Sequence, residues 1–187
     1  MIVEPYNPEW PRWFLRLQTF LYRNLVGTYY AIEHVGSTSV PGLTAKPIID
    51  VDVVLREGKF ENARGRLIAA GYEYEGDKGV PGREAFRLKD AGLRAALPEH
   101  HLYVCEAGSE ELRRQRAFRD FLRAHPEWVA KLSAHKLEVA ARVGDDREAY
   151  QEAKAAMVDE ILALALKQVL SPVDGPVLSP VEGEAPA

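Results

Sequence analysis

The stretch HVGSTSVPGLTAKPIIDVDVV, residues 34–54, decides how this chain folds and where its chemistry lies. From Ile48 to Leu55 it alternates acidic and apolar residues in its middle, which predicts a β-strand. Asp50 and Asp52 are two positions apart, so both carboxylates are expected on one face of that strand. Neighbouring carboxylates repel each other. Because a divalent cation relieves this repulsion and Mg²⁺ prefers oxygen ligands, the pair is a candidate metal site.

The segment before this strand, Gly36 to Pro47, is rich in Gly, Pro, Ser and Thr, which predicts a loop. A glycine lets the backbone approach a phosphate closely, and a serine hydroxyl can donate a hydrogen bond to it. Gly36 and Ser37 are therefore candidate phosphate ligands. The further candidates in the loop are Thr38, Ser39 and Lys46. For each hydroxyl the alternative is an ordinary turn residue, and for the lysine it is a solvated side chain.

The same residues carry a resemblance to a known fold and family. A Gly-Ser pair, twelve residues and an acidic–apolar–acidic–apolar strand resemble the motif of the nucleotidyltransferase superfold, here Gly36-Ser37 and Asp50-Val51-Asp52-Val53. The exact sequence of the segment, GSTSVPGLTAKPIIDVDVV, resembles the GrpB family in particular. The resemblance extends over nearly all of residues 1–170. It includes the segments GREAFRLK, HHLYVCEAGS and FRDFLRAH and the spaced residues Lys136, Tyr150 and Lys154.

This resemblance implies transfer of a nucleoside monophosphate from an NTP to an acceptor hydroxyl, with Mg²⁺ or Mn²⁺ as cofactor. Asp50 and Asp52 would be the catalytic residues and the metal ligands. Nucleotide and phosphate binding is assigned to Gly36, Ser37, Thr38, Ser39, Lys46, Arg83, Arg87, Lys136, Tyr150 and Lys154. Arg83 and Arg87 lie four apart on a predicted strand, where two arginines on one face favour an anion. Salt bridges to Glu73 or Glu75 are the alternative for these arginines.

Many members of the superfold have a third carboxylate on a later strand. The strand HHLYVCE carries His101 and Tyr103 in the region expected for it, and its acidic residue is Glu106, at the strand end. His101 and Glu106 are therefore the candidates for a third site group. Three hypotheses follow: the site uses one metal, it recruits His101, or it binds a ligand without catalysis.

The function has two alternatives. In the first, the pocket would hold a nucleotide or phosphorylated metabolite without turnover. In the second, the chain would be a phosphate-transfer accessory with a role linked to coenzyme A or nucleotides, because GrpB-like domains occur fused to a coenzyme A biosynthetic kinase. The chain has no Gly-Lys-Ser/Thr phosphate loop, so it is not expected to be such a kinase itself. It also lacks a nucleophile elbow, which argues against a hydrolase.

Composition limits the classes of protein further. Of 187 residues, 47% are hydrophobic and 28% charged, which excludes a wholly disordered chain, a collagen and a coiled coil. The single cysteine, Cys105, excludes an internal disulfide and a four-cysteine zinc site. The net charge is −4, and the last 17 residues hold three acids and no base, so the rest is nearly neutral. Broad charge-driven nucleic-acid binding is therefore not expected.

No secretory signal or membrane span is expected from the sequence. We therefore expect a cytoplasmic protein that binds a nucleotide and a small-molecule acceptor and has no membrane partner. Residues 1–170 are predicted to form one domain. Residues 171–187, SPVDGPVLSPVEGEAPA, have four prolines and two SPV(D/E)G units, which predict a disordered low-complexity tail.

The periodicity within residues 1–170 predicts an α+β fold. The first helix is expected to have Asn7 as its N-cap and Pro8 as its first residue. Strands are predicted over 29–35, 48–55, 72–75, 84–88 and 101–106, with a helix over 59–70. Three helices are predicted after Ser109, from Pro126 and from Asp145. This order indicates a small mixed, nucleotidyltransferase-like β-sheet packed with helices and a helical C-terminal half.

Overall fold

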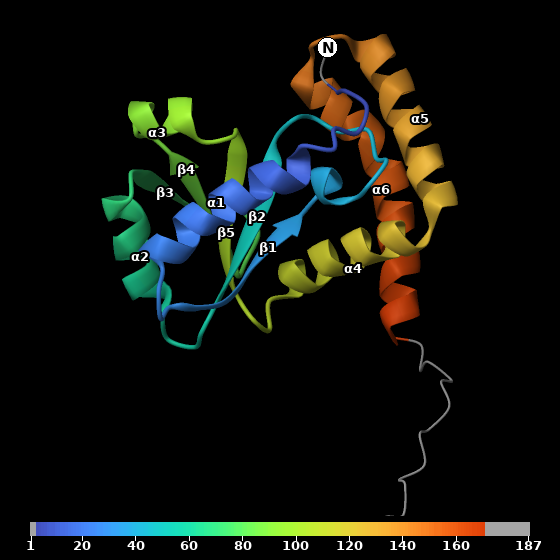
Figure 1. Cartoon of the computed structure of the whole chain (residues 1–187). Helices are drawn as coiled ribbons and strands as arrows, with labels where there is room; N and C mark the ends of the chain where they lie inside the picture. Colours follow the sequence, from blue (N-terminus) through green and yellow to red (C-terminus); the bar gives the residue numbers. More distant parts are fainter. Residues whose placement is uncertain (1–2, 171–187) are drawn as a thin grey trace, which may run out of the picture.

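The computed structural model describes residues 3–170 and confirms the α+β class, with one five-stranded mixed sheet covered by helices (Figure 1). The strands are β1 (Tyr29–Val35), β2 (Ile49–Leu55), β3 (Tyr72–Gly76), β4 (Arg83–Leu88) and β5 (His100–Glu106). The helices are α1 (Trp10–Asn24), α2 (Phe60–Ala69), α3 (Ala91–Ala96), α4 (Glu110–Ala124), α5 (Pro126–Val143), α6 (Arg147–Leu170) and a 3₁₀ turn, η1 (Ser37–Ser39). The predicted tail, residues 171–187, lies outside the described residues.

The sheet has the strand order β1-β2-β5-β4-β3, with β2 and β5 as a parallel pair and the other pairs antiparallel. Alternation divides β2 between two faces. Val51 and Val53 are buried in the core formed with α1 and α2, beside Leu17 and Leu67. The two aspartates of β2 point to the opposite face, as the sequence predicts. That face carries the candidate site.

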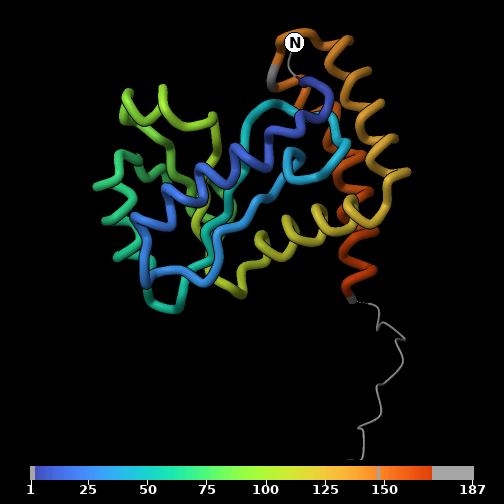
Figure 2. The backbone as a smooth tube through the Cα atoms, in the orientation of Figure 1, coloured from blue at the N-terminus to red at the C-terminus, as the bar shows by residue number. Residues whose placement is uncertain are grey.

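The helical C-terminal half has its own core. Phe118, Leu132 and Ile161 bring α4, α5 and α6 together, and Val40 and Leu43, which follow η1, are buried among them. The loop that links β1 to β2 therefore runs from the sheet into the helical half and back (Figure 2). This path places the start of the loop against α5 and α6. Among the helices within residues 3–170, none is long and apolar enough to cross a bilayer.

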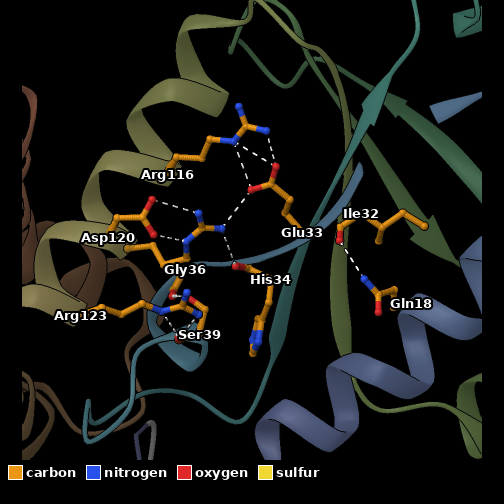
Figure 3. Close-up of polar contacts among 10 residues, drawn as sticks. Gln18, Ile32, Glu33, His34, Gly36, Ser39, Arg116, Asp120 and Arg123 are labelled. Atoms are coloured by element: carbon orange, nitrogen blue, oxygen red, sulfur yellow. Dashed lines mark hydrogen bonds and ion pairs between the residues drawn. The ribbon is translucent and has the colours of Figure 1, made fainter. Parts of the chain in front are cut away.

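Side chains from α1 and α4 cover the outer edge of β1 (Figure 3). Gln18 donates to the carbonyl of Ile32, and Arg119 donates to the carbonyl of His34 at 3.3 Å. Glu33 accepts hydrogen bonds from Arg116 and Arg119, which lower its pKa against the opposing effect of its partial burial. These contacts occupy outward-facing groups of an edge strand that would otherwise be free to pair with another chain.

This edge gives a first prediction. Replacing Arg119 with Met should destabilise the fold by about 1–2 kcal/mol, because Glu33 and the carbonyl of His34 each lose a donor. Urea unfolding at pH 7 measures the difference. The matched control is Arg113→Met on the same helix, where a half-exposed guanidinium lies 3.8 Å from Glu110 and should contribute little. Equal stability of both variants would contradict a structural role for this contact.

Three local predictions differ from the structure. The first helix begins at Trp10, because Asn7 instead caps a turn just before it, with Oδ1 accepting from the Glu9 amide at 2.9 Å. Helix α3 was not predicted, since its six residues are too few for a periodic pattern. The last helix begins at Arg147 and is capped by Asp146, whose Oδ1 accepts from two backbone amides, rather than by Asp145.

Candidate functional site

A cavity of about 320 Å³ lies between the acidic face of the sheet and the helical half; we call it the central cleft. The sheet side supplies Gly36, Ser37 and Asp50, and helices α5 and α6 supply Lys136 and Lys154. The opposite wall, from α4 and α6, is lined by Glu111, Arg114, Gln115, Phe118, Val158, Asp159 and Leu162. The cleft thus has an acidic group and two lysines on one side and a wall of mixed charged, polar and apolar side chains on the other.

Gly36 is fixed in the cleft by two constraints. Its φ of +68° lies in the left-handed region that favours glycine. A Cβ atom built at this position would lie 2.2 Å from Oδ2 of Asp50. The absence of a side chain therefore lets the backbone of the loop sit directly against the carboxylate of the strand.

Ser37 is held by a buried lysine from α5. The Nζ atom of Lys136 donates to Oγ of Ser37 at 2.7 Å and to the carbonyl of Thr44 at 3.0 Å. Only 3% of Lys136 is exposed. Burial, helped by the nearby charge of Lys154 and opposed by Asp50, lowers the pKa of Lys136 from 10.5 to about 7. Desolvation therefore disfavours the charged form of this lysine at the base of the cleft.

Two further lysines lie around Tyr150. The Nζ atoms of Lys46 and Lys154 are 5.0 and 5.6 Å from the centre of its buried ring. Burial lowers the pKa of Lys154, and the charge of Lys46 adds to the effect. Burial also raises the pKa of Tyr150 to about 12, so its hydroxyl stays neutral. The loop, α5 and α6 thus bring together three lysines that the sequence suggests as phosphate ligands.

Asp52 is fully buried and its carboxylate is paired on one side. Its Oδ1 accepts from Nη2 of Arg83 at 3.1 Å, whereas Oδ2 has no hydrogen-bond partner within residues 3–170. Burial raises the pKa of Asp52 to about 6, and Arg83 limits the shift. The guanidinium of Arg83 in turn lies 3.4 Å from the centre of the Tyr103 ring. Arg83 therefore binds the carboxylate of Asp52 and does not line the central cleft.

Asp50 is the accessible member of the pair. Its Oδ1 lies 2.9 Å from Nδ1 of His101, the residue directly opposite on β5. His101 is about half exposed and lies beside this carboxylate without lining the central cleft.

A divalent cation fits part of this arrangement. Asp50 and the unpartnered Oδ2 of Asp52 offer carboxylate oxygens on one face, which suits one Mg²⁺ completed by water and phosphate oxygens. Position 103, opposite Asp52 on β5, holds a tyrosine. Within residues 3–170, no group of three or more His, Cys, Asp or Glu side chains is placed to hold a metal ion. The residues therefore fit a single ion whose other ligands come from outside the chain.

Nine of the candidates do not line the central cleft: Asp52, Lys46, Arg83, Tyr150 and His101, described above, and Thr38, Ser39, Arg87 and Glu106. The hydroxyl of Thr38 lies 2.9 Å from Nε2 of His34, and that of Ser39 donates to the carbonyl of Gly36, so both serve the loop itself. Arg87 is exposed and forms ion pairs with Glu73 and Glu75, the alternative offered by the sequence. Glu106 pairs with Leu55 at the far end of β5 and does not approach Asp50.

The opposite wall of the cleft was not predicted. Its apolar residues are Phe118, Val158 and Leu162, which lie on helices whose apolar faces form the helical core. The sequence does not distinguish an apolar residue that lines a cavity from one that is buried inside the core. Gln115 and Glu111 were also missed. Gln115 donates to Glu111 at 2.7 Å, which is an ordinary contact one turn apart on a helix.

Comparison with known proteins gives a consistent set of relatives. The GrpB protein family matches residues 1–164. UPF0157 protein YqkA of Bacillus subtilis is 33% identical over 153 residues, 80% of this chain and 42% of that protein, so the chain spans less than half of that relative. Glutamate-rich protein GrpB of Alkalihalophilus pseudofirmus is 30% identical over 166 residues, covering 87% of this chain and 94% of that one. The crystal structure of conserved protein GrpB from Enterococcus faecalis superimposes with a TM-score of 0.79 at 32% identity, covering 91% of this chain and all of that chain.

Proposed function

This chain belongs to the GrpB family, and we propose that its central cleft binds the phosphates of an NTP with one divalent cation and transfers a nucleoside monophosphate to a small-molecule hydroxyl. The observation that carries the proposal is Lys136, a buried lysine that donates to Ser37 beside Asp50. Burying an ammonium group is costly unless an anion compensates it. A phosphate at Ser37 would provide that anion, within reach of Lys136 and Lys154.

The cation would be held by Asp50 and by Oδ2 of Asp52. When bound, Mg²⁺ or Mn²⁺ would neutralise phosphate oxygens and orient the phosphorus for attack. The remaining work falls to the chain. Ser37 and Lys136 hold the leaving phosphates, and the apolar side chains Phe118, Val158 and Leu162 exclude water from the nucleoside. The acceptor oxygen bonds to the α-phosphorus, the bond from that phosphorus to pyrophosphate breaks, and the hydroxyl proton passes to water.

The acceptor has a separate place to bind. A second cavity of about 210 Å³ lies on the other side of the Asp50–His101 pair and is lined by Glu75, Lys78, Arg87, His101 and Tyr103. Its lining combines an aromatic surface with charged donors and acceptors, which suits a small polar molecule. Because His101 borders this cavity and contacts Asp50, a hydroxyl bound there would lie next to the proposed cation site.

The second candidate is binding of a nucleotide or phosphorylated metabolite without turnover. It is favoured by Tyr103, which stands directly opposite Asp52 where a third carboxylate would complete a two-metal site. The two candidates share the phosphate site and differ in product. Release of pyrophosphate from ATP in the presence of pooled small-molecule alcohols supports transfer, and stoichiometric binding without pyrophosphate supports the second candidate.

Calorimetric titration with ATP, GTP, CTP and UTP, with and without Mg²⁺, tests the phosphate site. We expect at least one NTP to bind the full chain, with about tenfold tighter binding when Mg²⁺ is present. Asp50→Asn should remove that difference and keep the binding seen without Mg²⁺. Glu106→Gln is the matched control, because Glu106 is an acid of the same sheet that lies away from the cleft. An absence of NTP binding by the wild-type chain would overturn the proposed function.

A further inference from the structure

The Arg83–Asp52 pair is incompletely satisfied on both sides. Asp52 and Arg83 join through one hydrogen bond, yet Oδ2 of the aspartate and Nε of the arginine are both buried without a hydrogen-bond partner among residues 3–170. Unpaired buried polar atoms are costly, so they usually mark a functional contact. The aspartate thus has one oxygen occupied by a cation of the chain and one oxygen left for another cation.

The position of Arg83 is also fixed by an aromatic ring. Its guanidinium stacks on Tyr103, which is the residue paired with Asp52 across the parallel β2–β5 ladder. Stacking on an aromatic ring holds a guanidinium in place while leaving its charge intact. Position 103 therefore holds a tyrosine where a third carboxylate would help to bind a metal ion. The tyrosine ring instead holds the positively charged Arg83 there.

The neighbouring carboxylates have counter-charges of their own. Glu33, opposite Asp52 on β1, is bound by Arg116 and Arg119. Glu111, whose charge also reaches Asp52, accepts from Gln115 and lies 3.3 Å from Nε of Arg114. Neither acid is left to bind a second ion. The charges of Asp50, Asp52 and Arg83 together amount to one negative charge. One divalent cation already more than neutralises that charge.

We propose that Arg83, held against the ring of Tyr103, takes the place of a second divalent cation, so that the cleft holds a single Mg²⁺ or Mn²⁺ between Asp50 and Asp52. This inference rests on the proposed function in its choice of cation. Two-metal sites clamp the attacking and leaving oxygens with two ions. Here a fixed guanidinium provides the second positive charge, and it cannot be removed by a chelator or exchanged for another metal.

Counting Mn²⁺ tests the inference without nucleotide or turnover. Titration of the full chain, with free Mn²⁺ followed by electron paramagnetic resonance, should give one bound ion per chain in the wild type. The double variant Arg83→Gln, Tyr103→Asp should bind a second ion, or bind the first about tenfold more tightly, because a local positive charge is replaced by an acid. Two ions in the wild type, none in the wild type, or an unchanged double variant would each overturn the inference.

Three controls separate a charge effect from damage to the fold. Arg83→Lys keeps the charge, and Tyr103→Phe keeps the ring, so each should still bind one ion. Arg12→Gln alters an exposed arginine of α1, paired with Glu9 and in the lining of neither cavity, and should behave as the wild type. Circular dichroism confirms that each variant is folded. Because ATP binding depends on Ser37 and Lys136, a failure of the proposed function would leave the Mn²⁺ count measurable and independent.

Discussion

Replacing Lys136 with methionine should weaken ATP binding by about a hundredfold, because the cleft loses its buried cation and its donor to Ser37. Methionine is close to lysine in shape and needs no counter-charge, so the helix packing around position 136 should persist. Calorimetric titration of both proteins at pH 6.5 measures the loss. The matched control is Lys131→Met, an exposed lysine of the same helix that lies over Trp128 and does not line the cleft.

The pH dependence of the stability of this variant tests the burial of Lys136 independently of ATP binding. The pKa of Lys136 is about 7 in the folded chain and 10.5 in its ordinary state, so between these values the unfolded chain holds a proton that the folded chain has released. Stability should therefore rise with pH across this window, at most by about 1.4 kcal/mol per pH unit for this group. In urea unfolding, the free energy of unfolding of the wild type should therefore rise relative to that of Lys136→Met as the pH increases from 7 to 9.

ATP affinity should change in the opposite direction. As the pH rises above 7, Lys136 loses the charge that attracts phosphate, so wild-type binding weakens. The other charged side chains that line the cleft are Asp50, Glu111, Arg114, Lys154 and Asp159. Lys136→Met should lack this dependence. Equal ATP affinity for the wild type and Lys136→Met at pH 6.5 would contradict the placement of phosphate at Ser37, whatever the stability data show.

Gly36→Ala should destabilise the fold by about 2 kcal/mol and abolish the Mg²⁺ dependence of ATP binding. An alanine at φ +68° is strained, and its Cβ would lie 2.2 Å from Oδ2 of Asp50, so the carboxylate would have to move. Urea unfolding and ATP titration with and without Mg²⁺ measure the two effects.

Gly27 provides the control for this variant. It has a φ of +79°, similar to that of Gly36, but no atom lies within 4 Å of the position its Cβ would take. Gly27→Ala should therefore show only the backbone strain, about 1 kcal/mol, and should keep the Mg²⁺ dependence. If both alanine variants lost it, the close contact between Gly36 and Asp50 would not be the cause.

Much of the sheet and one end of the cleft could be predicted from local pattern. Asp50 and Asp52 are recognisable because acidic residues interrupt a strand of Ile and Val, and alternation requires them to share a face. The turn at Gly36 and Ser37 is likewise encoded within a few residues. The family resemblance added Lys136 and its neighbours on α6, which no local pattern distinguishes from surface lysines.

The partners of these residues could not be predicted. Arg83 meets Asp52 from 31 positions away, and Lys136 meets Ser37 from 99 positions away, so each contact depends on how the sheet and helices assemble. The hydroxyls of Thr38 and Ser39 resemble that of Ser37 in sequence, yet the first contacts His34 of β1 and the second donates to the carbonyl of Gly36. Which of three adjacent hydroxyls faces a cavity is decided by one tight turn.

The loop between β1 and β2 has a consequence for the molecule as a whole. It leaves the sheet, whose strand β2 carries Asp50, is buried among α4, α5 and α6, and returns, with the amide of Thr44 donating to Ser133 on the way. The central cleft therefore joins two parts of the molecule, with Asp50 on the sheet side and Lys136 and Lys154 on the helical side. A phosphate with its cation would bind to both parts at once. Cohesion of the two parts and occupancy of the cleft are then one linked equilibrium, in which each strengthens the other.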